Sequence, residues 1–383
     1  MIKNITTKIF LYLLIFWLII CGAVVSDYFY FKFLTVKLPL IYITIIILIL
    51  TFVYVILTIY FVLNKPLAEI MKQIHFLLTA RPYKRFIITR RDEIGVLEYF
   101  FNEVTSSIAK LSSQIRESER MTSELSLANK LQRDMLPQTA PILPGLLVSA
   151  KASLATEVGG DNFDFLVFPK YALIYLGDVT GHGVPAALVM TMSHAFIESY
   201  AATTDNMREI MINLNTQIRK RISSNMFMTL VMLKWDFENK KLTYAGAGHE
   251  HIIVYKSSRG ECMTIKTGGI AIGMVQDNSK LIVESEIPFE IGDFVILYSD
   301  GITEAKNASG EMFSLQRLQE SITKYANQYS PDGISYHVAL DIKRFIGDVP
   351  PADDMTLIVM QYIGDQKVQQ TSSSLDTKWH KNL

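Results

Sequence analysis

The fold is decided by residues 159–183, which read GGDNFDFLVFPKYALIYLGDVTGHG. Two apolar and aromatic runs, residues 163–168 and 172–176, flank Pro169 and Lys170, and this pattern predicts two buried strands joined by a tight turn. In an antiparallel hairpin about that turn, residues whose numbers sum to about 339 lie opposite each other. The predicted register brings Asp161 and Asp178 together at one end of the hairpin.

Two further aspartate motifs lie at the ends of predicted strands. Asp300 follows the apolar run 294–298, and Asp353 precedes the run 355–362, so both side chains can reach the same edge of a sheet. Aspartate beside glycine is also common in ordinary turns, so one such motif alone would indicate little. Four motifs in this arrangement predict a single acidic site.

The predicted acidic site has the chemistry of a metal centre. Crowded carboxylates raise one another's pKa unless a cation neutralises them. Oxygen ligands without a nearby cysteine or a helical pair of histidines favour magnesium or manganese over zinc or copper. Two such ions can activate water and neutralise a phosphoryl oxygen, which predicts phosphate-ester hydrolysis. The candidate catalytic and metal-binding residues are Asp161, Asp178, Asp300 and Asp353.

An ordered set of motifs resembles the SpoIIE/RsbU-like branch of the PPM-type (type 2C) serine/threonine phosphatases. The resemblance extends over about residues 126–363, and the ordered set is highly specific. Its motifs are ANKLQRDMLP (128–137), EVGGDNFDF (157–165), GDVTGHGVPAAL (177–188), MFMT (226–229), AGH (247–249), YSDGITEA (298–305) and DDMT (353–356).

The resemblance implies an α+β fold, a two-layer antiparallel β-sandwich flanked by helices, with two Mn²⁺ or Mg²⁺ ions at one edge. By family, the metal ligands would be Asp161, Asp178, the Val179 carbonyl, Asp300 and Asp353. The first acidic residue of the last motif is the family ligand, so we prefer Asp353 to Asp354. Relatives dephosphorylate serine or threonine on a small anti-anti-sigma factor with a STAS fold. We therefore expect a phosphorylated STAS-type regulatory protein as substrate, in bacterial signal transduction and sigma factor regulation.

Some positions depart from the family pattern. A tyrosine is common where Asn162 or Phe163 stands, and an asparagine where Gly246 stands, but neither change removes an expected ligand. Eukaryotic-type relatives carry a histidine where Thr180 stands, so we assign no general-acid histidine. We interpret His182 as a turn or helix-start residue, with a catalytic role as the alternative.

Other features of the same region are interpreted as structural. His249 and His251 lack a third ligand that would make them a zinc site. A helix beginning at Pro185 is predicted to bury a stripe of residues at helical spacing. That stripe is Leu188, Met192, Phe196 and Tyr200.

The N-terminal part of the chain contains two nearly uncharged stretches, about residues 9–25 and 38–63, each long enough to cross a bilayer as a helix. A signal peptide is the alternative for the first, but no small-residue cleavage site follows it. The loop 26–37 is too short for a sensor domain. Basic residues follow the second stretch, which predicts a multi-pass protein with its catalytic domain in the cytoplasm. Together with the bacterial family that the chain resembles, this implies the bacterial inner (cytoplasmic) membrane.

Residues after the second span resemble a HAMP linker. Pro66 opens a short amphipathic segment, a basic connector (81–91) follows, and then comes Asp92-Glu93-Ile94-Gly95. An ordinary capped helix is the alternative. HAMP linkers are parallel helical bundles in dimers, and apolar residues at helical spacing continue to Met135 as a stalk, so we expect a homodimer.

These observations divide the chain into five parts. We predict two transmembrane helices (1–64), a HAMP-like linker (65–111), a helical stalk (112–138), a PPM-type phosphatase domain (139–364) and a disordered polar tail (365–383).

Composition limits the competing functions. The 37 basic residues balance 37 acidic ones, so no overall charge favours nucleic acid. Two cysteines provide no disulfide framework.

A catalytically silent signalling scaffold of the same fold is the main alternative function, against which the retained aspartates argue. A sensor kinase is disfavoured because no phosphoacceptor histidine precedes a glycine-rich nucleotide lid.

Overall fold

A computed structural model describes residues 4–27 and 40–365. The predicted external loop (26–37) and disordered tail (365–383) fall almost wholly outside these residues. The chain divides into two compact units, Met1–Arg120 and Met121–Leu383, and each is described by itself.

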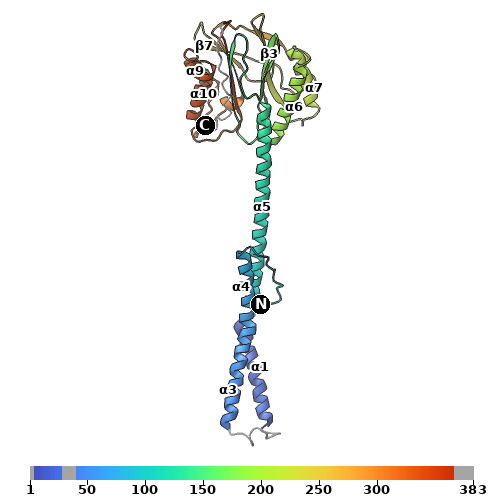
Figure 1. Ribbon diagram of the computed structural model, residues 1–383, viewed down its shortest axis with the longest axis vertical. Coiled ribbons are helices and arrows are strands. Elements are labelled where there is room, and N and C mark those ends of the chain that lie inside the picture. Colours follow the sequence, from blue (N-terminus) through green and yellow to red (C-terminus); the bar gives the residue numbers. More distant parts are fainter. Residues whose placement is uncertain (1–3, 28–39, 366–383) are drawn as a thin grey trace. The chain divides into compact units, whose positions relative to one another are not determined.

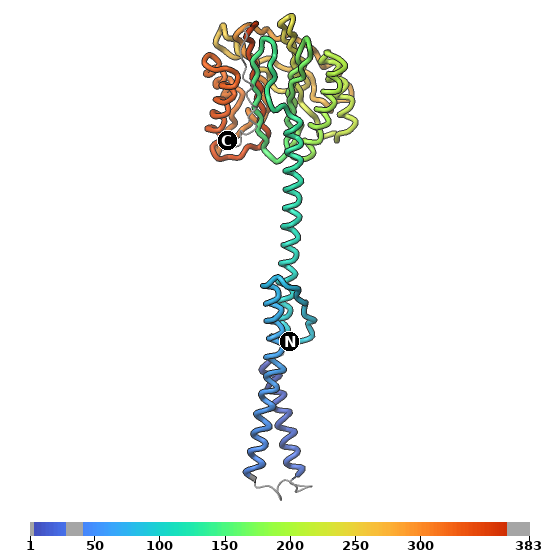
Figure 2. The backbone as a smooth tube through the Cα atoms, in the orientation of Figure 1, coloured from blue at the N-terminus to red at the C-terminus, as the bar shows by residue number. Residues whose placement is uncertain are grey.

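The first unit begins with two apolar helices that lie within or across the two predicted spans, of which residues 38–39 fall outside the described residues. They are α1 (Ile5–Ser26) and α3 (Leu40–Ile59); the latter continues through a π-helical turn, η2 (Tyr60–Asn64), into α4 (Lys65–Leu78). By length and composition, Ile5–Ser26 and Ile41–Leu78 could each cross a membrane. Figure 2 shows α1 and α3 side by side.

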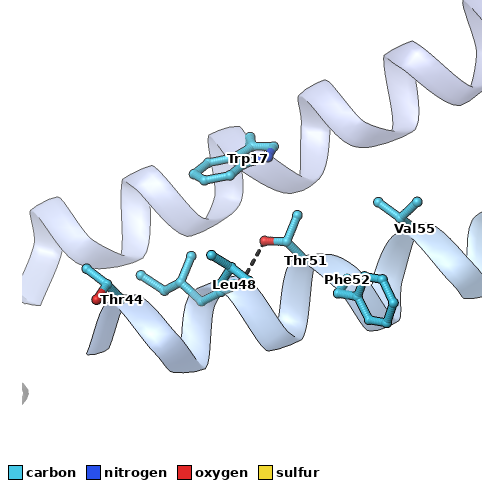
Figure 3. Close-up of a pocket in the computed structure, with 7 residues that line it drawn as sticks. Trp17, Thr44, Leu48, Thr51, Phe52 and Val55 are labelled. Carbon is cyan, nitrogen blue, oxygen red and sulfur yellow. Dashed lines mark hydrogen bonds between the residues drawn. The ribbon is translucent and has the colours of Figure 1, made fainter. Parts of the chain in front are cut away.

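A groove of about 530 Å³ lies between these two helices. Trp17 of α1 lies across from Thr44, Leu48 and Thr51 of α3 (Figure 3). The Thr51 hydroxyl donates to the Ile47 carbonyl at 2.7 Å, so this polar group is satisfied within its own helix. Such internal pairing allows threonine to lie in an apolar environment.

The segment after α4 has no regular structure until α5 (Glu93–Met135) begins. Helix α5 is 43 residues long and passes through the predicted linker–stalk boundary at 111/112 without a break. The carboxylate of Asp92, just before it, is fully buried and accepts hydrogen bonds from Arg90, Lys8 and the Gly95 N–H. Arg90 also donates to the Val62 carbonyl of η2 at 3.0 Å. The Asp92 cluster therefore joins α1, η2 and α5.

The second unit is a sandwich of two five-stranded sheets in which all neighbouring strands are antiparallel. Sheet I has the order β1 (Leu146–Ser153), β10 (Met355–Tyr362), β9 (Phe294–Tyr298), β6 (Ile252–Lys256), β7 (Glu261–Ile265). Sheet II has the order β2 (Asn162–Val167), β3 (Tyr171–Val179), β4 (Met228–Asp236), β5 (Lys241–Ala247), β8 (Glu284–Ile287). The predicted fold class is confirmed.

Helices cover both outer faces of the sandwich (Figure 1). Sheet II is covered by α6 (Val184–Ala201) and α7 (Met207–Arg219). Sheet I is covered by α9 (Ser314–Ala326) and α10 (Pro331–Ile346). This arrangement buries the central strands β3, β4, β9 and β10 on both faces, which explains why they read as continuous apolar runs, whereas the edge strands β7 and β8 are largely exposed.

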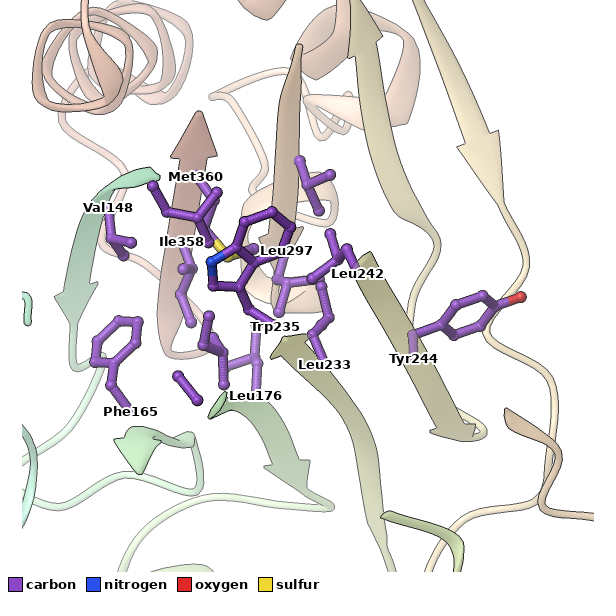
Figure 4. Close-up of a cluster of buried hydrophobic side chains, with 14 of the residues drawn as sticks. Val148, Phe165, Leu176, Leu233, Trp235, Leu242, Tyr244, Leu297, Ile358 and Met360 are labelled. Atoms are coloured by element: carbon purple, nitrogen blue, oxygen red, sulfur yellow. The ribbon is translucent and has the colours of Figure 1, made fainter. Parts of the chain in front are cut away.

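The core between the sheets is built around Trp235 of β4 (Figure 4). Its indole is fully buried, and Nε1 donates to the Pro144 carbonyl at 2.9 Å. Leu176 of β3 and Ile358 of β10 belong to the same cluster. The two sheets are therefore held together by one apolar layer, with the ends of the strands left free to form a site.

The prediction of which stripe of α6 is buried is wrong. Leu188 is 60% exposed, and Met192, Phe196 and Tyr200 are only partly buried. The neighbouring stripe faces the sheet instead: Ala186, Val189, Met190, Ser193, His194, Ile197 and Ala201. Because α6 is apolar around most of its circumference, helical spacing alone did not decide which stripe packs on sheet II.

Candidate functional site

The β2–β3 hairpin has the predicted register, with Asn162 opposite Gly177. Asp161 lies immediately before β2, and Asp178 is the second-last residue of β3. The two side chains are therefore at the same end of sheet II. A Cβ at Gly177 would come within 2.9 Å of the Thr229 carbonyl oxygen on the next strand and would also displace the Met228 methyl group, so a larger residue beside Asp178 would strain the pairing of β3 with β4.

Sheet I supplies the other two carboxylates. Asp300 opens the short helix α8 (Asp300–Thr303) directly after β9, and Asp353 lies two residues before β10. These strands are neighbours, and the Ser299 N–H donates to the Thr356 carbonyl at 3.0 Å. Asp300 and Asp353 are therefore brought to one edge of the sandwich.

The two carboxylate oxygens of Asp161 differ in their hydrogen bonding. Its Oδ2 accepts hydrogen bonds from Ser299 Oγ at 2.8 Å and from Thr356 Oγ1 at 2.5 Å. Its Oδ1 is buried and has no hydrogen-bond partner among the described residues. A buried carboxylate oxygen without a partner is costly. One side of Asp161 therefore remains available for a ligand.

The adjacent residues Asp353 and Asp354 differ in burial and in hydrogen-bond partners. Asp354 is buried, and its two carboxylate oxygens accept from the Ala155 N–H at 2.8 Å and the Gly160 N–H at 2.7 Å. Asp353 is only partly buried and accepts from the Asp354 N–H at 2.9 Å. Asp354 thus holds the loop before Asp161, which supports the preference for Asp353 as ligand.

The acidic groups affect one another's ionisation. Burial, with the neighbouring charges of Asp300 and Asp353, raises the pKa of Asp178 to about 8. Burial and the charge of Asp353 raise the pKa of Asp300 to about 6, and protonated Asp178 can donate a hydrogen bond to Asp300. Burial, then the charges of Asp178 and Asp354, raises the pKa of Asp161 well above its usual range. All four sequence-predicted aspartates therefore take part in one electrostatic cluster.

The donor set fits a hard divalent cation. Within residues 4–27 and 40–365, no three His, Cys, Asp or Glu side chains already converge in a metal-binding geometry. The open Oδ1 of Asp161 and the mutual repulsion of the carboxylates are nonetheless features that a cation would relieve. The Val179 carbonyl lies against Gly160, where a Cβ would come within 2.8 Å of its oxygen.

Three residues at this edge have contacts that the sequence analysis did not assign. Gln132 of α5 forms a pair of hydrogen bonds with Gly159: Nε2 donates to the carbonyl at 2.7 Å, and the Gly159 N–H donates to Oε1 at 3.0 Å. Ser299 and Thr356 contact Asp161 directly. All three stand inside motifs quoted above, so their positions were visible, but hydrogen-bonding partners distant in sequence were not.

Two histidines near this edge, His249 and His182, lie in loops. His249 is buried, and its Nδ1 is 2.9 Å from Thr229 Oγ1. Burial lowers the pKa of His249 to about 4. His182 is exposed between Gly181 and Gly183, which both have positive φ.

Comparisons with known proteins agree with this fold. The family model described as Stage II sporulation protein E (SpoIIE) matches residues 169–363, a little over half of the chain. Phosphoserine phosphatase RsbU of Bacillus subtilis (strain 168) is 28% identical over 245 residues, which are 63% of this chain and 71% of RsbU. Protein IcfG of Synechocystis sp. is 27% identical over 299 residues, 71% of this chain. The chain spans a little under half of IcfG, 46% of its length.

Solved structures share the sandwich. The SiaA-PP2C domain of Pseudomonas aeruginosa superposes with a TM-score of 0.55 at 22% identity, over 64% of this chain and 98% of that domain. The RsbU and RsbW domains of a Mycobacterium tuberculosis protein give a TM-score of 0.54 at 23% identity, over 61% of this chain and 64% of that one. At these identities the likeness shows a PP2C fold.

Proposed function

The chain belongs to the Stage II sporulation protein E (SpoIIE) family of PP2C-type serine/threonine phosphatases, and we propose that it is a membrane-anchored, metal-dependent enzyme of bacterial signal transduction. Its reaction would be hydrolysis of phosphoserine or phosphothreonine on a regulatory protein. One observation carries the proposal: four aspartates from four separate motifs gather at one edge of the sandwich, two from each sheet.

The proposed metal site consists of Asp161, Asp178, the Val179 carbonyl, Asp300 and Asp353. Two Mn²⁺ or Mg²⁺ ions bound there would activate a water and neutralise charge on the phosphoryl group. The contribution of the chain itself is to place the carboxylates. Asp354 fixes the loop before Asp161 through two backbone N–H groups, and this keeps the acidic edge assembled.

A STAS-type regulatory protein is the substrate class that we propose. The support is the family resemblance, together with the name of the relative RsbU, a phosphoserine phosphatase. Gly181 and His182, in the loop that follows β3 and Asp178, are exposed, and we propose that a protein substrate approaches the site over this loop.

We also propose anchoring in the cytoplasmic membrane, with residues 1–64 as the hairpin, 65–111 as a HAMP-like linker, 112–138 as a stalk and 139–364 as the phosphatase domain. The two helices apolar enough to cross a bilayer support the hairpin. Dimerisation through the linker and stalk is supported by exposed apolar side chains on α5, where Ile108, Leu111 and Ile115 are 49%, 59% and 51% exposed. A monomer in light scattering of the detergent-solubilised chain would contradict the dimer.

The enzyme assignment is tested with the full chain in detergent, manganese and the phosphorylated STAS proteins of the source organism. We expect one of these proteins to lose phosphate. The Asp300→Asn variant should lose at least about 100-fold in rate, because one carboxylate of the site is gone.

Asp332→Asn is the matched control, since Asp332 is exposed at the start of α10. Its rate should equal that of the unaltered chain. If the protein binds a phosphorylated STAS protein but never releases phosphate, the scaffold alternative is correct and the enzyme proposal is wrong.

A further inference from the structure

We propose that Ser299 and Thr356 are positioning residues for the metal site. Their two hydroxyls, here called the hydroxyl clamp, hold Asp161 so that its free oxygen faces the site, and they tie the two sheets together at this edge. The inference rests on the proposed metal-dependent function and adds to it a role for two residues that are not themselves ligands.

The clamp is built from short, buried contacts. Ser299 Oγ and Thr356 Oγ1 both donate to Oδ2 of Asp161, at 2.8 and 2.5 Å. The Thr356 N–H in turn donates to Ser299 Oγ at 2.9 Å, which orients that hydroxyl. The Asp354 carbonyl is a second acceptor near Ser299 Oγ, at a longer 3.2 Å. Ser299 and Thr356 are 0% and 1% exposed, so water does not compete for these bonds.

Other buried aspartates of the same domain show that this arrangement is specific to Asp161. Asp354 uses both carboxylate oxygens, on Ala155 and Gly160. Asp293 also uses both carboxylate oxygens. One accepts from the Ser257 N–H, and the other accepts from the Lys256 ammonium and the Glu290 backbone N–H. Asp161 instead receives two donors on one oxygen, and none of the described residues donates to the other. A carboxylate with a purely structural role would be expected to satisfy both oxygens.

The clamp also crosses from one sheet to the other. Asp161 leads into β2 of sheet II, whereas Ser299 follows β9 and Thr356 lies in β10 of sheet I. Asp178 comes from sheet II, and Asp300 comes from sheet I. The separation between these carboxylates therefore depends on how closely the sheet ends are held. Groups that orient metal ligands typically change metal affinity by about 10- to 100-fold when removed.

The test is a calorimetric titration of Mn²⁺ into the full chain in detergent. Thr356→Val keeps the shape of the side chain and removes the hydroxyl, so the Kd for Mn²⁺ should rise about 10- to 100-fold. Thr356→Ser restores a hydroxyl and should return the Kd to within about 3-fold of the original. Ser299→Ala removes the other half of the clamp and should weaken binding in the same direction.

Ser335→Ala is the matched control for the loss of a buried hydroxyl. Ser335 is fully buried in α10, and its Oγ donates to the Pro331 carbonyl at 2.9 Å, away from the acidic edge. The Kd of the Ser335→Ala variant for Mn²⁺ should be unchanged, even if its thermal midpoint falls as far as that of Thr356→Val. Phosphate release supplies a second measurement: in Thr356→Val, excess Mn²⁺ should recover most of the rate.

The outcomes separate the clamp from the enzyme proposal. If the unaltered chain binds Mn²⁺ and both Thr356→Val and Ser299→Ala bind it equally well, the clamp is wrong while the phosphatase assignment stands. If Thr356→Val does not fold, Ser299→Ala decides by the same criterion. If the unaltered chain itself binds no Mn²⁺ or Mg²⁺, the proposed metal-dependent function is overturned.

Discussion

His249 shows how burial changes the meaning of a residue type. In the sequence, AGHEH suggests a pair of metal ligands, yet the side chain of His249 is buried and bonded to Thr229. Its pKa is lowered to about 4, chiefly because burial disfavours the charged imidazolium. The neutral ring is held at Nδ1 by Thr229, while Nε2 is buried without a hydrogen-bond partner among the described residues.

This pKa predicts a pH dependence of stability. An unfolded histidine titrates near pH 6.5, so between pH 6.5 and 4 the unfolded chain binds more protons than the folded one. The unfolding free energy therefore has its full value with respect to His249 above pH 6.5. As the pH falls toward 4, protonation of this histidine in the unfolded chain lowers that free energy by about 3 kcal/mol at most. Denaturant titrations of His249→Asn should show a smaller loss of unfolding free energy over this range.

The control for this prediction is His182→Asn, because His182 is exposed in the loop before α6. Its unfolding free energy should follow that of the unaltered chain at every pH. Equal pH slopes for His249→Asn and the unaltered chain would contradict the assignment.

At the scale of single residues, the sequence predicted which carboxylates gather but not what holds them. Asp161, Asp178, Asp300 and Asp353 were found because each stands at the end of an apolar run. The bonds from Gln132 and Thr356 join positions 27 and 195 residues apart. No local pattern encodes such distant partners, so they appear only once the chain is folded.

Among the elements, the β2–β3 hairpin was predictable down to its register, because a short turn fixes which residues face each other. The buried face of α6 was not, since apolar residues surround most of that helix. The linker and stalk likewise share one helical spacing, and the structure accordingly has a single helix α5 across their predicted boundary.

The end of α5 gives a prediction for an element. Gln132 both donates to and accepts from the Gly159 backbone. Gln132→Glu keeps the acceptor but sets an oxygen against the Gly159 carbonyl, so the domain should lose about 1–3 kcal/mol of stability. Phosphate release should also fall, because Gly159 leads directly to Asp161. Thermal denaturation and the phosphatase assay measure the two effects.

Gln138→Glu is the matched control. The Gln138 amide is exposed and donates to carbonyls at the end of the same helix, those of Arg133 and Leu136. Its effect on stability should be within about 0.5 kcal/mol. A Gln132→Glu protein as stable and active as this control would disprove the role of the Gly159 contact.

At the scale of the whole molecule, composition located the two apolar helices, since long uncharged runs need no tertiary information. The Asp92 cluster could not be predicted in this way. Lys8 and Asp92 are 84 residues apart, and the ion pair depends on how α1 packs beside the end of α3. Burial alone would raise the pKa of Asp92, but bonds from Arg90 and Lys8 hold it far below its usual range.

A double-mutant cycle tests this cluster. Lys8→Met and Asp92→Asn should each speed tryptic cleavage of the connector 81–91 in the detergent-solubilised chain, because a buried ion loses its partner. The cycle should give a coupling free energy of about 1–3 kcal/mol. Lys72→Met, whose ammonium lies over the Phe76 ring rather than on a carboxylate, serves as control. Additive effects of the two substitutions would show that the ion pair does not fasten α1 to α5.

The glycines around Asp354 limit how this enzyme could be redesigned. A Cβ at Gly159 would collide with the Asp354 carboxylate, and one at Gly301 would collide with its carbonyl. No new side chain can be grafted there without displacing the acidic edge. His182, in contrast, already projects into solvent in the loop after Asp178. A protein engineer seeking a different choice of phosphoprotein would therefore build a library at the outer loop and leave the inner glycines untouched.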